Sequence, residues 1–97
     1  MGMKRTITEA KLQKYFSITK EALEKAGKAL DKTRLKEAEE VLDMASRYFQ
    51  DARYFADEKK DGVLAFAALN YAHGWLDAGA RMGLFKVKDS RLFTVDD

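Results

Sequence analysis

Apolar residues recur every three or four positions along most of this chain, which is the spacing of one face of an α-helix. The first stripe consists of Leu12, Phe16, Thr19, Leu23, Ala26 and Leu30. The second keeps the same alternation through Leu35, Ala38, Leu42, Ala45, Phe49, Ala52 and Ala56. In the third segment, residues 62–81, we expect the core-facing arc to be Leu64, Ala68, Leu69, Ala72, Trp75, Leu76 and Gly79.

Capping signals bound these helices, which we expect at about residues 7–31, 34–58 and 62–82. Thr6 and Glu9 have the spacing of a capping box before the first helix. Either Asp31 or Thr33 is placed to cap the second helix, and Asp61 is placed to cap the third. The links between the helices are therefore short, and helices joined by short links pack as antiparallel neighbours.

The 97 residues contain no proline, which favours long uninterrupted helices. A chain of this length has room for one hydrophobic core. We therefore predict a single all-α domain over residues 1–97, built as an up-down-up three-helix bundle. Gly83 stands where a left-handed C-terminal cap belongs.

The tail that follows, residues 84–97, is too apolar to be left in water. Its apolar positions are Leu84, Phe85, Val87, Leu92, Phe93 and Val95. We expect this tail to fold back onto the bundle, or to pair with another chain, in an extended conformation.

The amino-acid composition excludes several kinds of site and several cellular locations. The chain has no cysteine, so a disulfide, a zinc site with thiolate ligands and a cysteine nucleophile are all excluded. Lysine and arginine interrupt the first thirty residues, where a secretory signal needs an apolar run. Segment 62–81 is long enough to span a bilayer, but it carries Asn70, His73 and Asp77 across its middle. We expect a cytoplasmic protein that does not enter the membrane.

The polar residues of the third helix fall on one face, because Asn70, His73, Asp77 and Arg81 are three or four positions apart. Asp77 lies one turn from His73 and could fix its tautomer, as a catalytic or metal-binding histidine requires. However, this is the chain's only histidine, and no serine lies in a nucleophile motif. We predict no enzyme, metal site or cofactor. The candidate is an interaction surface that also includes Gly74, and the alternative is a solvated helix face.

Two glycines lie inside the third helix, where each lowers the stability of the helix by roughly 1 kcal/mol relative to alanine. Gly79 falls on the core side and is expected to be a packing glycine. Gly74 falls on the polar side, where contact with the tail or with a second subunit would explain it better than tolerance.

The first helix is basic. Its lysine row consists of Lys4, Lys11, Lys25 and Lys32, flanked by Lys14 and Lys28. Such a row is typical of a nucleic-acid surface. Ile18 and Glu21 interrupt it, and no aromatic residue shares the face, so a solvated lysine face is the simpler interpretation.

From about Ala45 onward the chain resembles an archaeal family of small helical proteins, domain of unknown function 357. The resemblance lies in DARYF (51–55), LNYAHGWLDAGAR (69–81) and LFTV (92–95). It implies an archaeal cytosolic three-helix protein, and the family has no assigned activity to transfer. We therefore predict a non-catalytic helical module that acts through protein–protein contact or self-association. The alternative is a nucleic-acid or nucleotide-binding accessory protein that uses the basic face of the first helix.

Overall fold

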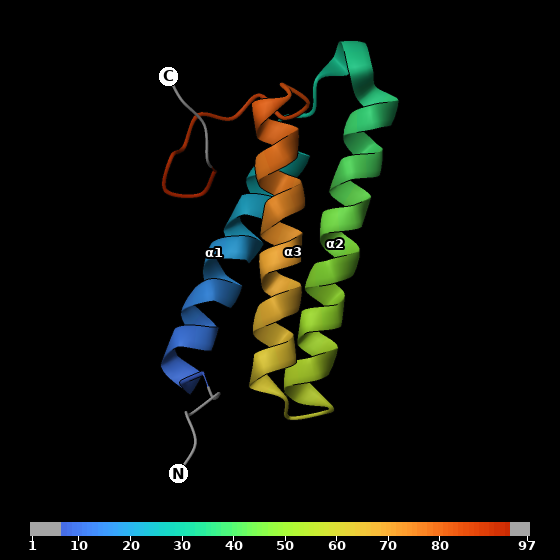
Figure 1. Ribbon diagram of the computed structural model, residues 1–97. Helices are drawn as coiled ribbons and strands as arrows, with labels where there is room; N and C mark the ends of the chain where they lie inside the picture. Colours follow the sequence, from blue (N-terminus) through green and yellow to red (C-terminus); the bar gives the residue numbers. More distant parts are fainter. Residues whose placement is uncertain (1–6, 94–97) are drawn as a thin grey trace.

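A computed structural model of the chain, which describes residues 7–93, contains the three expected helices. Helix α1 spans Glu9–Gly27, α2 spans Leu35–Asp57 and α3 spans Gly62–Arg81, and a 3-10 turn, η1, covers Lys32–Arg34. The helices run up, down and up, and α3 lies between the other two (Figure 1). Over residues 7–93 there is no β-strand. The all-α three-helix bundle is confirmed.

The helix ends follow the capping chemistry in most places. Asp61 caps α3 as predicted, because its carboxylate accepts a hydrogen bond from the Leu64 N–H at 3.0 Å. Gly83 has a φ of +76°, the left-handed conformation expected there. Thr8 caps α1, and the expected cap at Thr6 lies outside the described residues. Asp31 caps η1 rather than α2 itself.

The first helix ends at Gly27, and the prediction that it continues to about residue 31 is wrong. The reason is the C-terminal tail. Leu30 forms an antiparallel β-bridge with Phe85, and the Lys86 N–H donates to the Ala29 carbonyl at 2.7 Å. These backbone groups pair with the tail, so they cannot also continue the helix.

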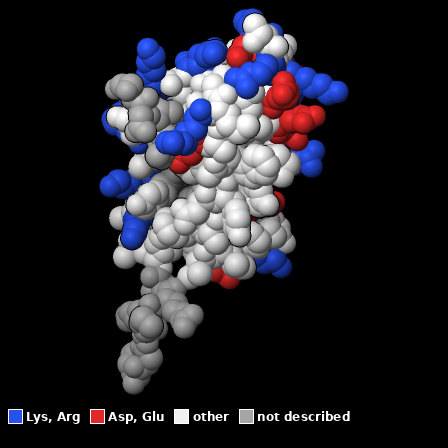
Figure 2. Space-filling view, turned by 45° about the horizontal axis from the view of Figure 1, so that its top comes forward, with Lys and Arg blue, Asp and Glu red and all other residues white. Residues whose placement is uncertain are grey.

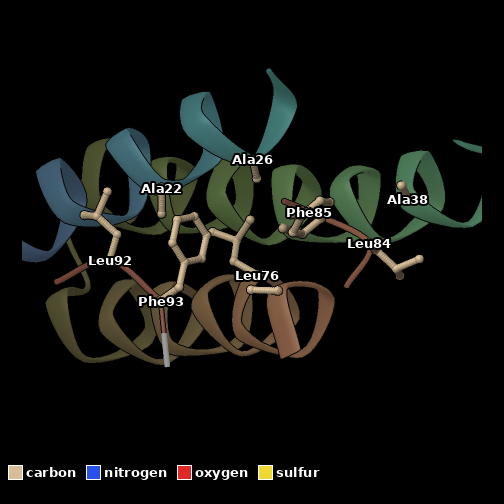
Figure 3. Packing of buried hydrophobic residues seen from close by; sticks show 10 residues of the cluster. Ala22, Ala26, Ala38, Leu76, Leu84, Phe85, Leu92 and Phe93 are labelled. Carbon is tan, nitrogen blue, oxygen red and sulfur yellow. The ribbon is translucent and has the colours of Figure 1, made fainter. Parts of the chain in front are cut away.

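The prediction that the tail folds back onto the bundle is confirmed for residues 84–93, whereas Val95 lies outside the described residues. Its four buried apolar side chains, each at most 3% exposed, are Leu84, Phe85, Leu92 and Phe93. The helix positions in the same cluster are largely small, and they include Ala22, Ala26, Ala38, Ala45 and Ala80. Figure 3 shows the Phe93 ring between Ala22 of α1 and Leu76 of α3. Alanine cannot fill the space between helices, so the tail supplies the volume that the helices lack.

At the other end of the bundle the helices supply their own large side chains. The buried residues there are Leu12, Phe16, Ala52, Ala65, Ala68 and Leu69. Phe16 of α1 meets Phe49 of α2 edge to face, with 5.7 Å between the ring centroids. The core therefore consists of a helical half and a half that depends on the tail.

Three residues that the pattern assigns to the core are on the surface. Leu35 is 42%, Leu64 is 46% and Trp75 is 36% exposed. For the two α3 residues the reason is geometric, because α3 packs on α1 and α2 with one side only. Its opposite side is largely exposed, although Tyr71 on that side stacks on Tyr48 of α2. Within that range no helix has both the length and the apolar character needed to cross a membrane.

Candidate interaction surface on α3

His73 joins three parts of the fold. Its Nε2 bonds to the carbonyl oxygen of Leu92 in the tail. A carbonyl can only accept, so Nε2 carries the proton, and Nδ1 is left to accept from the Thr19 hydroxyl of α1 at 3.4 Å. The Asp77 carboxylate lies 3.8 Å from the same Nε2. Both ring nitrogens thus contribute to holding α1, α3 and the tail together.

A hollow of about 360 Å³ lies beside His73, between α1 and α3. It is lined by Tyr15, Ile18, Thr19, Leu69, Asn70, His73, Gly74, Asp77 and Arg91. Four of the five predicted surface residues therefore meet around one depression. Arg81, the fifth, is exposed farther along α3 and does not line this hollow.

Arg91 is the lining residue that the sequence did not indicate. Its guanidinium donates to Asp89 at 2.9 Å and to Glu21 of α1 at 3.2 Å. Lys25 of α1 donates to the same Asp89 carboxylate at 3.1 Å. The arginine and then the lysine hold the pKa of Asp89 well below its ordinary value. Glu21 and Lys25 are 70 and 64 positions away from their partners in the tail, so local spacing could not have identified these two contacts.

The polar groups of this hollow mainly fasten the tail. His73 bonds to Leu92, and Arg91 and Asp89 are paired with each other and with α1. Over residues 7–93 there is no group of three His, Asp or Glu side chains that could hold a metal ion. The groups of this hollow that a ligand could contact are the exposed side-chain amide of Asn70 and the exposed backbone of Gly74.

Next to the hollow, the outward side of α3 presents an apolar surface, which the exposed Arg81 interrupts near the C-terminal end of the helix. We call this the open face of α3, and its exposed residues are Val63, Leu64, Ala67, Tyr71, Gly74, Trp75, Ala78 and Met82, the last just beyond the helix end. Tyr71 is 64% and Met82 is 63% exposed. Figure 2 shows the corresponding uncharged band along the middle of the molecule, with the charged side chains at its borders.

Large and small residues have separate places on the open face. Tyr71 leans toward α2, where it stacks on Tyr48 with 5.3 Å between the ring centroids. Ala67, Gly74 and Ala78 form a low strip beside it. Within residues 7–93, a Cβ built at Gly74 would have no neighbouring atom within 4 Å, so the described part of the tail does not cover this glycine. A second depression of about 300 Å³ is lined by Ala67, Asn70 and Tyr71.

The basic row expected on the first helix is not one helical row. Lys28 and Lys32 lie beyond the end of α1, and Lys32 belongs to η1. Lys25 is bonded to Asp89 of the tail. Lys11 and Lys14 remain exposed on α1, and Lys4 lies outside the described residues.

The family description "Protein of unknown function (DUF357)" matches residues 14–85. The chain belongs to this family. The DUF357 match covers most of α1 and all of α2 and α3, so it begins well before the resemblance noted from Ala45 onward. It ends at Phe85, and the LFTV segment therefore lies beyond it. No curated protein and no solved structure matches the chain.

Proposed function

We propose that this DUF357 protein is a small non-catalytic module that acts through protein–protein contact, and that the open face of α3 is the contact surface. The observation that carries the proposal is the clustering of exposed apolar side chains. Of the seven large apolar residues exposed within residues 7–93, five lie on this face, namely Val63, Leu64, Tyr71, Trp75 and Met82. Contiguous apolar surface of this kind is typical of interaction sites.

The fold gains little from these side chains. The core lies on the other side of α3, and both of its clusters are complete without the open face. Tyrosine and tryptophan are the residues that most often dominate the binding energy of protein interfaces. Tyr71, which is the most exposed of the five, and Trp75 are therefore expected to contribute most of the binding energy.

A non-catalytic role is supported by the way the polar residues are used. His73 is engaged through both ring nitrogens, and the charged groups beside it are paired with the tail. We place the module in an archaeal cytosol, in line with the family resemblance. Its basic face on α1 is then a solvated face, and we expect no retention of RNA or DNA in a filter-binding assay at low salt.

The test is site-specific photo-crosslinking in cells. A benzophenone amino acid placed at Tyr71 should give crosslinks to protein, because that side chain points into the proposed contact. The matched control carries the same group at Tyr54, an exposed tyrosine of α2 that is 49% accessible and lies outside the open face. Protein crosslinks only from position 71 would support the proposal. Equal yields at both positions, or crosslinks to nucleic acid instead, would refute it.

A further inference from the structure

We infer that the end of the tail, residues 88–93, is a strap that opens and closes a groove between α1 and α3 while the rest of the chain stays folded. The open face of α3 takes no part in this motion, which is therefore independent of the proposed function. Three features of the tail support it: the way its two parts are attached, the exposure of its ion pairs, and the surface that lies beneath it.

The two parts of the tail are attached in different ways. The first part, residues 84–87, pairs with the bundle through its backbone, and the Lys86 N–H donates to the Ala29 carbonyl at 2.7 Å. In the strap, the N–H groups of Leu92 and Phe93 donate to a carbonyl of the strap itself. Within the described part of the chain, no backbone-to-backbone hydrogen bond joins the strap to a helix. The strap can therefore leave without breaking the backbone pairing of the first part.

The ion pairs that attach the strap to α1 are exposed to solvent. Arg91 donates to Glu21 at 3.2 Å, and Lys25 donates to Asp89 at 3.1 Å. The side chains of Glu21, Lys25 and Arg91 are 44%, 46% and 67% exposed. Ion pairs exposed to this degree contribute little to stability, and salt screens them. The polar attachment of the strap to α1 is therefore weak.

The groove beneath the strap has apolar walls and a polar group. Leu92 and Phe93 are each 2% exposed, and Figure 3 shows the Phe93 ring between Ala22 of α1 and Leu76 of α3. His73 donates a hydrogen bond to the Leu92 carbonyl. When the strap leaves, this N–H donor and the two helix walls become accessible. The groove then joins the hollow beside His73, because the strap forms part of the wall of that hollow.

Most of the core remains when the strap opens. The tail-dependent cluster loses Leu92 and Phe93 but keeps Leu76, Leu84 and Phe85. The buried residues of the helical half all lie on helices. A segment with few buried contacts opens locally at a smaller free energy than global unfolding requires. The closed state is therefore the main one, and the open state is a minor population in exchange with it.

The first experiment measures how often the groove is uncovered, by thiol labelling of single cysteines in the full chain, which has no native cysteine. Ala22→Cys lies under the strap, and its matched control Ala65→Cys lies in the helical half. Both alanines are 0% exposed. Labelling under the strap should be at least ~10-fold faster, because it requires only local opening. Equal rates, after correction for the stability of each variant in urea, would overturn the inference.

The second experiment weakens the strap alone. Arg91→Gln removes the pair with Glu21 and should speed labelling of the cysteine under the strap about 2- to 5-fold, with no change at the control cysteine. Arg47→Gln is the matched control variant, because it removes an exposed pair with Asp43 on α2 at 2.9 Å, and it should change neither rate. Equal acceleration at both cysteines by Arg91→Gln would show that this arginine stabilises the whole fold, and the strap would be refuted.

Hydrogen exchange of the unmodified chain tests the same motion without a core substitution. The amides of Leu92 and Phe93 should exchange faster than the amide of Leu84, which donates to the Gly79 carbonyl at 2.8 Å. Added salt should speed exchange in the strap only. If all three amides exchange together at the rate of global unfolding, the tail is a single unit and there is no strap. A probe at Tyr71 that captures no protein would refute the proposed function and leave these rates unchanged.

Discussion

Two glycines of α3, only a little more than one turn apart, have opposite surroundings. Gly79 faces the core, and a Cβ added there would overlap the ring of Phe85. Gly74 faces outward, and no atom of residues 7–93 lies within 4 Å of a Cβ built there. The helical pattern predicts both orientations correctly. It could not indicate that the neighbour of Gly79 is an aromatic ring of the tail rather than the backbone of another helix.

This contrast gives a prediction for alanine at each position. Gly79→Ala should lower the free energy of unfolding by about 1–3 kcal/mol, because Phe85 must move to admit the new methyl group. Gly74→Ala should raise it by about 0.5–1 kcal/mol through helix propensity alone. Urea unfolding at concentrations too low for self-association measures both. Equal effects at the two positions would show that Phe85 does not pack on Gly79.

His73 marks the limit of prediction at the level of single residues. Its spacing from Asp77 predicts a neighbour one turn away, and the two side chains do lie 3.8 Å apart. Its closer partners are Thr19 and Leu92, which are distant in the sequence. Helical periodicity orders residues within one element only, so it could not show that this histidine fastens the tail.

Among the elements, the tail departs most from a simple three-helix picture. Its apolar content predicts that it folds back, but not where it docks. The docking place of the tail is marked by small residues of the cluster that it joins. Ala22, Ala38 and Ala45 cannot fill a core alone, so this cluster needs large side chains from elsewhere. In the sequence these positions look like ordinary stripe residues. Their need for an aromatic partner becomes visible only when the helices are assembled.

The contribution of the tail can be measured by truncating its most central ring. Phe85 is 1% exposed, so Phe85→Ala should lower the free energy of unfolding by about 3–5 kcal/mol through lost contacts and a residual cavity. That is a large share of the 5–15 kcal/mol typical of a whole domain. Tyr54→Ala on exposed α2 surface is the control and should change it by about 0.5 kcal/mol or less. Similar losses for both variants would argue against a tail-dependent core.

The attachment of the tail should also make stability depend on acid pH. The Thr33 hydroxyl and N–H, helped by nearby Lys86, lower the pKa of Asp31 from 3.8 to about 2. Arg91 and Lys25 lower the pKa of Asp89 in the same direction. Because both pKa values are lower in the folded state, the stabilisation is complete above about pH 4. It is lost as the pH falls from there toward 2.

Thermal unfolding between pH 6 and pH 2 tests this dependence. The wild-type midpoint should fall as the solution is acidified through this range. In the double variant Asp31→Asn, Asp89→Asn, the midpoint should be lower at pH 6 and should fall less steeply. Parallel curves for the two proteins would mean that these carboxylates do not carry the acid sensitivity.

At the scale of the whole molecule, the sequence predicts the helix order and the direction of each helix. It also predicts the covered side of α3, since Ala68, Leu69, Ala72, Leu76 and Gly79 are buried as expected, but it makes that side too wide. Leu64 and Trp75 are apolar and were assigned to the core, yet they lie on the open face. Apolar character is the same signal for a residue that packs inside a chain and for one that packs against a partner. A residue buried within the chain can be told from one exposed on the open face only when α1 and α2 are in place, because these two helices determine which side of α3 is covered.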